Sequence, residues 1–131
     1  MSHRDDNLSF RAGGTIHRGR AVKLQSDGTV VEITDRTDLV VGWAANDAHP
    51  AHPVSVTTMF EGILRIEIER VGNLYAGAWM TLTDDGRMTR WYNNVEEPRM
   101  AMLINNMKTD TGIYADVLVL RHLSKWDRPD P

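Results

Sequence analysis

The sequence predicts an all-β protein, a small barrel or sandwich of about nine or ten short strands. Val, Ile and Thr account for 29 of the 131 residues, and these residue types favour strands. Glu, Lys and Gln, which favour surface helices, number only ten in total. Short alternating apolar runs recur between turn-forming residues, and Asp-Gly pairs mark two of those turns, which is typical of β-hairpins.

The chain begins with a polar stretch that reaches Gly13-Gly14 with few large apolar side chains. We therefore expect an extended N-terminal arm over residues 1–14. A single β domain is expected over residues 15–121, where apolar runs alternate with turns. The polar residues 122–131, which include two prolines among the last three positions, are expected to form a C-terminal tail.

Two hairpins organise the predicted strands. The first turns at Ser26-Asp27-Gly28 and the second at Asp84-Asp85-Gly86. Strict alternation of apolar and charged residues over 64–69 indicates a half-buried strand. In chain order, the predicted strands are residues 21–25, 29–33, 39–45, 54–58, 64–69, 79–83, 87–91, 100–107 and 113–120.

An internal repeat supports this reading. Residues 19–30 align with residues 77–88 at a constant offset of 58, and Gly, Leu and Asp-Gly coincide. A weaker echo aligns residues 41–46 with residues 100–105 at an offset of 59. The repeat predicts two similar hairpin units, roughly 15–68 and 74–121. It also favours a strand for the segment that starts at residue 100, although the apolar spacing there would equally fit one face of a helix.

Composition excludes several classes of protein. The 15 basic residues are scattered singly and the net charge is −3, so the basic footprint of a nucleic-acid-binding protein is absent. No apolar run reaches the roughly 18–20 residues that a membrane span requires, and the polar N-terminus does not resemble a secretion signal. The chain has no Cys, which rules out disulfides, thiolate metal sites and Cys nucleophiles.

One loop contains residues that could bind a metal ion. Asp47, His49 and His52 offer a carboxylate and two imidazoles, which are zinc ligands. The prolines of this loop hold it extended, and a third imidazole would have to come from His17 or His122. A small metal-dependent enzyme is therefore the less favoured alternative. We expect no catalytic residue, no metal, no other cofactor and no small-molecule substrate.

Bulky apolar pairs beside turns indicate a protein interface. Met59-Phe60 and Trp91-Tyr92 each place two large side chains next to each other at a strand end. Neighbouring residues of a strand point to opposite faces, so both members of a pair cannot enter one core. We expect one of Met59 and Phe60, and one of Trp91 and Tyr92, at a contact between subunits.

Several short motifs resemble the capsid decoration (cement) proteins of tailed bacteriophages. They are the hairpin pattern G-x-x-V-x-L…G-x-V over residues 19–30, the run Val-Gly-Trp-Ala at 41–44 followed by Asp47-Ala48, and the segment from Pro53 to Gly62. The resemblance covers about residues 16–68 and continues more weakly through residues 77–90. This chain departs from the family pattern at residues 49–53, where the family has a tight turn, and at residues 91–99.

The resemblance implies a β-rich homotrimer that binds the major capsid protein on the outer surface of an expanded phage head. Such proteins occupy three-fold and quasi-three-fold positions and stabilise the shell against DNA pressure, so this chain would be made in the host cytoplasm and end in the virion. The family's arm often adds a strand to the shell. That role would fall on Asn7, Leu8, Ser9, Phe10, Arg11 and Ala12. Another phage structural part, such as a tail-tube or head-completion protein, is the alternative; nucleic acid and membrane are not expected partners.

Overall fold

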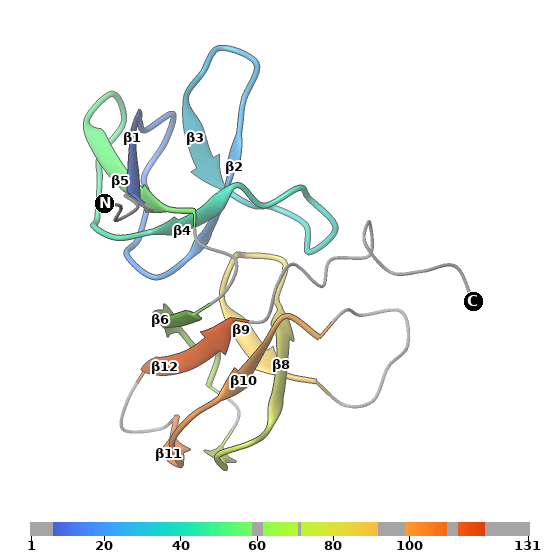
Figure 1. Cartoon of the computed structure of the whole chain (residues 1–131). Coiled ribbons are helices and arrows are strands. Elements are labelled where there is room, and N and C mark those ends of the chain that lie inside the picture. The colour runs from blue at the N-terminus through green and yellow to red at the C-terminus, as the bar shows by residue number, and fades with distance from the viewer. Residues whose placement is uncertain (1–6, 59–61, 71, 92–98, 110–112, 120–131) are drawn as a thin grey trace. The chain divides into compact units, whose positions relative to one another are not determined.

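The part of the chain that the structure describes contains β-strands and no helix, which confirms the all-β prediction (Figure 1). The structure is a computed structural model. It describes residues 7–58, 62–70, 72–91, 99–109 and 113–119. The C-terminal tail expected over 122–131 lies outside these residues.

The chain divides into two compact units by its internal contacts. Unit 1 comprises Met1–Met59 together with Asp84–Gly86, and unit 2 comprises Phe60–Thr83 together with Arg87–Pro131. Unit 1 holds the strands β1 (Asn7–Arg11), β2 (Ala21–Leu24), β3 (Val30–Glu32), β4 (Gly42–Ala44) and β5 (Pro53–Thr57). Unit 2 holds the strands β6 (Gly62–Glu67), β7 (Asn73–Leu74), β8 (Trp79–Leu82), β9 (Met88–Arg90), β10 (Ala101–Leu103), β11 (Met107–Lys108) and β12 (Tyr114–Val119).

Each unit contains a five-stranded antiparallel sheet, and the two sheets have the same topology. The strand order is β1-β5-β4-β2-β3 in unit 1 and β6-β12-β10-β8-β9 in unit 2. Strands β7 and β11 form a separate two-stranded ladder. Both predicted hairpins are present, as β2–β3 and β8–β9. The described residues thus form twelve strands, where the sequence predicted nine or ten.

The repeat predicted from the sequence is a repeat of structure. The offset of 58 relates the first residues of β2 and β8 and those of β3 and β9, and the offset of 59 relates β4 to β10. The amide of Gly19 donates to the carbonyl of Ala44 at 2.8 Å, and that of Gly77 donates to Leu103 at 2.8 Å. Residues 101–103 are a strand rather than a helix, as the repeat indicated.

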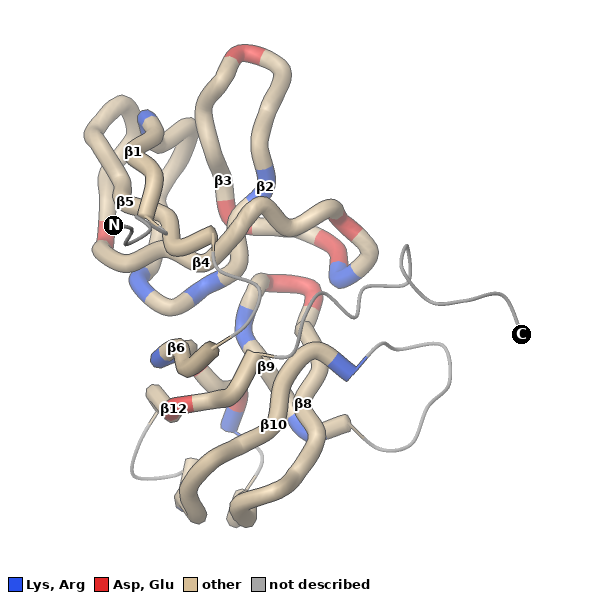
Figure 2. The backbone as a smooth tube through the Cα atoms, in the orientation of Figure 1, with Lys and Arg blue, Asp and Glu red and all other residues tan. Residues whose placement is uncertain are grey.

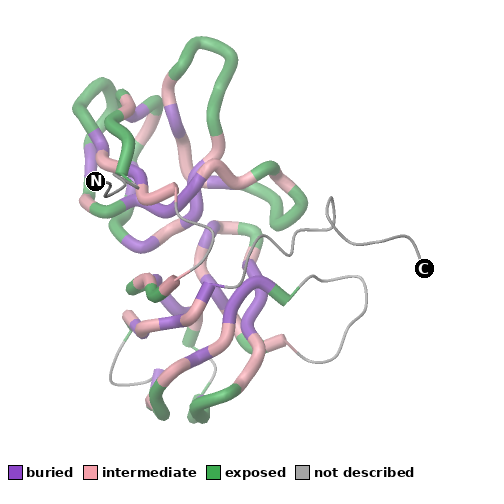
Figure 3. The backbone as a smooth tube through the Cα atoms, in the orientation of Figure 1, coloured by how far each residue is buried: buried purple, intermediate pink, exposed green. Residues whose placement is uncertain are grey.

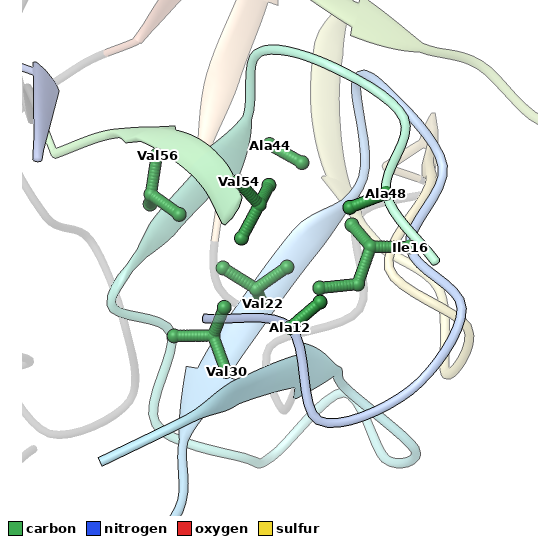
Figure 4. Close-up of a cluster of buried hydrophobic side chains, with 8 residues drawn as sticks. All are labelled: Ala12, Ile16, Val22, Val30, Ala44, Ala48, Val54 and Val56. Carbon is green, nitrogen blue, oxygen red and sulfur yellow. The ribbon is translucent and has the colours of Figure 1, made fainter. Parts of the chain in front are cut away.

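Matching positions also form the cores of the two units. In unit 1, small and β-branched residues gather between the strands (Figure 4). These are Ala12, Ile16, Val22, Val30, Ala44, Ala48, Val54 and Val56. At the repeat-related positions of unit 2, larger side chains are buried, including Ile68, Leu74, Met80, Met88 and Leu103. Figure 3 shows the resulting alternation of buried and exposed positions along the strands. Apolar burial of this kind is the main stabilising contribution to each unit.

Gly42 in β4 shows why a glycine is needed inside one strand. A Cβ atom at this position would collide with the carbonyl oxygen of Thr57 on β5, the neighbouring strand. The close approach of the two backbones therefore requires a residue without a side chain.

The segment expected as an arm belongs partly to the sheet of unit 1. Residues Asn7–Arg11 form β1 and pair with β5 of the same chain over five positions. Ala12 follows with only 1% of its surface exposed, in the core cluster. The sequence pattern did not indicate this pairing, because an edge strand buries few side chains and its alternation is weak.

Candidate functional site

Strand β1 is one edge of the sheet of unit 1, and its residues are the predicted capsid-binding segment. Leu8 lies opposite Val56, and Phe10 lies opposite Val54. The amide of Ala12 donates to the carbonyl of His52 at 2.9 Å, so Ala12 directs its backbone toward β5. In an antiparallel ladder the backbone groups of successive residues point alternately to the two sides.

The alternation fixes which backbone groups of β1 are used within the chain. Phe10 and Leu8, two and four positions before Ala12, direct their N–H and C=O groups to β5. Ser9 and Arg11 direct theirs to the outer side. Where β1 ends, this side already meets β3 through the parallel bridge between Ala12 and Val30, in which the N–H of Gly13 donates to the carbonyl of Val30 at 2.8 Å. The edge is therefore open at Ser9, before this bridge, where one N–H donor and one C=O acceptor face an added strand.

A groove lies beside this open edge. Its volume is about 430 Å³, and it is lined by Ser9, Phe10, Arg11, Gly28 and Pro53. Gly28 comes from the turn between β2 and β3, so the groove runs between the edge strand and that hairpin. Nearby, Leu8 is 50% exposed, which is high for a leucine in a strand. An extended peptide placed here would find backbone partners on one side and apolar surface at the rim.

Arg11 is the one charged residue in the sequence of β1, and its side chain is held in place. Its Nη1 atom donates to the carbonyl of Ala51 at 2.9 Å. Ala51 has a positive φ of 72°, a conformation that L-residues adopt rarely and that the surrounding loop has to hold. The edge thus carries a positive charge beside its free backbone groups. Elsewhere, basic and acidic positions are interspersed along the chain (Figure 2).

Unit 2 repeats the open edge in β6. The amide of Ile68 donates to the carbonyl of Ile113 at 2.6 Å, as that of Ala12 does to His52 in unit 1. By the same alternation, Ile63 and Arg65 turn their backbone groups away from β12. Ile63 is 61% exposed. The duplicated fold therefore gives the chain two equivalent edges, each with an exposed aliphatic side chain.

The predicted interface residues can be placed only in part. Met59, Phe60 and Tyr92 lie outside the described residues. Trp91 is half-buried directly after β9, and its amide donates to the carbonyl of Trp79 at 2.8 Å. Its place at a subunit contact remains a prediction, as does the capsid-binding role of residues 7–12.

The loop that holds the candidate metal ligands uses its polar groups internally. One oxygen of Asp47 accepts the backbone N–H of Arg18 at 2.7 Å. The rings of His49 and His52 meet edge to face, with their centroids 5.9 Å apart. Within the described ranges no three His, Cys, Asp or Glu residues come together as metal ligands. His122, a possible third ligand, lies outside those ranges.

His17, the other possible third ligand, is engaged elsewhere. Its Nδ1 atom lies 2.7 Å from Oε2 of Glu32, which also accepts the backbone N–H of His17. This pair links the segment before β2 to β3, so both side chains have a structural role within unit 1.

The partly buried carboxylate of Asp38 organises the loop between β3 and β4. Oδ2 of Asp38 accepts the backbone N–H of Thr34 at 3.0 Å and the ammonium of Lys23 at 3.0 Å. Burial by itself raises the pKa of Asp38. The hydrogen bonds and the positive charge of Lys23 lower this pKa by more, so the net shift is downward from the ordinary value of 3.8. The carboxylate is thus held ionised as part of the loop's structure.

No described residue belongs to a helix long and apolar enough to cross a membrane. Comparison with protein-family models gives no match. Comparison with curated protein sequences gives none either.

The fold, in contrast, has a known counterpart. The chain is similar in structure to the N base of the head fiber gp8.5 of bacteriophage phi29. The similarity has a TM-score of 0.66 and covers 89% of this chain and 95% of the other, with 12% sequence identity. Because almost the whole of each chain is matched, the shared fold includes both units and not just one hairpin. The low identity explains why sequence comparison does not detect the relation.

Proposed function

We propose that this protein is a structural component of a tailed-phage head that binds the outer surface of the capsid. The observation that carries the proposal is the fold shared with a phage head-fiber base across 89% of the chain. The sequence resemblance to capsid decoration proteins, which rests on residues 16–68 and 77–90, supports the same role independently. The described residues also gather no set of metal-ligating side chains that would favour an enzyme.

The proposed site on the protein is the open edge of β1, supported by its groove. Ser9 presents its backbone N–H and C=O groups outward there, and Leu8 presents an exposed side chain. Pairing with an extended segment of the major capsid protein would use backbone hydrogen bonds, each worth about 0.5–1.5 kcal/mol. Binding only to the expanded shell would stabilise that state by mass action.

We further propose that the protein acts as a homotrimer at three-fold and quasi-three-fold positions. A trimer contacts several capsid subunits at once, so weak single contacts add up to strong attachment. From the sequence we expect one of Met59 and Phe60, and one of Trp91 and Tyr92, at the contact between copies. Burial of one large aromatic side chain contributes roughly 1.5–3 kcal/mol, enough to influence such an association.

The test is direct binding to heads of the phage that encodes the protein. Purified protein is mixed with expanded heads that lack it, with unexpanded heads and with tails, and each sample is pelleted. We expect saturable co-sedimentation with expanded heads alone. Binding to tails, or to the portal vertex in micrographs, would instead identify a tail-tube or head-completion protein and would overturn the proposal.

A further inference from the structure

A stack of two tryptophans and one arginine lies on unit 2. Trp79 begins β8, and Trp91 lies opposite it directly after β9, in register with the pair Met80–Arg90. The guanidinium carbon of Arg99 is 4.8 Å from the ring centroid of Trp79 and 5.3 Å from that of Trp91. Both distances are within the range of a cation–π interaction, about 6 Å. The guanidinium is thus held by two indole rings.

The duplicated fold shows that this stack is not needed to build the sheet. The positions in unit 1 that match Trp79 and Trp91 are Ala21 and Ile33, where the same backbone hydrogen bond has a length of 3.2 Å. Val40 matches Arg99, because the residues that follow them make equivalent hydrogen bonds. The N–H of Val41 donates to Val22 in β2, and the N–H of Met100 donates to Met80 in β8. Unit 1 therefore forms the same local structure with three aliphatic residues.

The chemistry of the stack points to an anionic group. Arg99 is exposed, and within the described part of the chain its guanidinium has no hydrogen bond or ion pair. The contact with the two rings uses the charge of the guanidinium and none of its N–H groups. Those N–H groups match the two oxygens of a carboxylate. Because the rings already restrict the side chain, binding would cost less conformational entropy than at a free arginine.

We propose that Arg99, held over the rings of Trp79 and Trp91, binds an Asp or Glu side chain of a second copy of this chain. The proposal rests on the proposed self-association, in which Trp91 is a predicted contact residue. The chain's 18 Asp and Glu residues supply the carboxylates that a second copy would present. Trp and Arg are also the residue types most enriched among the residues that dominate interface energies.

The carboxylate site is tested first with acetate as the probe, with chloride at equal ionic strength as the control. NMR spectra of the ¹⁵N-labelled full chain report the Nε–H of Arg99 and the indole N–H groups of Trp79 and Trp91. We expect saturable shifts of these signals with acetate in the wild type, and none in Arg99→Gln. Arg99→Lys keeps the charge without the planar fork. Acetate should bind this variant at least tenfold more weakly, as judged from the indole signals. Equal responses to acetate and chloride would overturn the site.

The second copy is tested by sedimentation equilibrium of the isolated protein up to millimolar concentration. We expect Arg99→Gln to weaken self-association at least tenfold, while Arg70→Gln, at an exposed arginine of the same unit, leaves it unchanged. A wild type that stays monomeric, or an Arg99→Gln protein that associates like the wild type, would overturn the assignment to a second copy. Neither measurement uses phage heads, so these outcomes are separate from failure of the proposed capsid binding.

Discussion

Replacing Ser9 with proline tests the open edge of β1 without disturbing the fold. The Ser9 N–H points away from β5, so proline at this position removes a donor that the chain itself does not use. The β1–β5 ladder should stay intact, and the free energy of unfolding should change by less than about 0.5 kcal/mol. Leu8→Pro is the matched control, because the neighbouring N–H points toward β5.

The two variants should separate folding from binding. Leu8→Pro loses a hydrogen bond within the chain and should lower the free energy of unfolding by about 1–3 kcal/mol. Ser9→Pro should instead lose one bond to the capsid in each copy, about 0.5–1.5 kcal/mol. Three such losses in a trimer add up to about 1.5–4.5 kcal/mol, which corresponds to roughly a tenfold to a thousandfold weaker attachment.

Urea unfolding measures the first quantity, and co-sedimentation with expanded heads measures the second. Ser9→Ala serves as the side-chain control and should match the wild type in both assays. A Ser9→Pro protein that is fully folded and binds heads with wild-type affinity would refute strand addition at β1.

Three further predictions concern the fold. Removal of residues 1–13 should destabilise unit 1 by several kcal/mol, since it takes away an edge strand and a buried alanine. The sequence alone suggested an arm whose removal leaves the domain folded. A melting temperature within about 2 °C of the wild type would support that view instead. Gly42→Ala should lower the free energy of unfolding by more than about 2 kcal/mol because of the clash with Thr57, and urea denaturation showing no loss would contradict the packing described for β4 and β5. The lowered pKa of Asp38 means that its carboxylate stabilises the fold above pH 3.8, and that this contribution disappears as the pH falls through the folded-state pKa. The melting temperature of Asp38→Asn should therefore lie below that of the wild type at neutral pH and converge with it in strong acid. A constant difference in melting temperature at all pH values would speak against this linkage.

The sequence predicted the elements whose signals are local. The turns at Asp27-Gly28 and Asp85-Gly86 define two hairpins, because φ is positive at both glycines, 88° and 91°. The offset of 58 then identified the repeat, and its weaker continuation identified a strand after Met100 that apolar spacing alone could not separate from a helix. Strands β7 and β11 were missed, since two residues each are too few to show alternation.

Long-range features left no comparable trace in the sequence. The pairing of residues 7–11 with residues 53–57 depends on backbone groups that every residue possesses, so no local pattern reports it. The stack of Trp79, Trp91 and Arg99 joins residues up to 20 positions apart, and only the β8–β9 register brings the two rings to one face. The sequence drew attention to Trp91 through its position beside a turn, but gave no indication of its partners.

A reconstruction of the expanded head decorated with this protein tests capsid binding most directly. We expect β-rich trimers on the outer surface at three-fold and quasi-three-fold positions, with β1 against an extended segment of the major capsid protein. Single well-separated copies at those positions would contradict the trimer. Density at the tail or portal, with none on the outer surface of the shell, would contradict the proposed function itself.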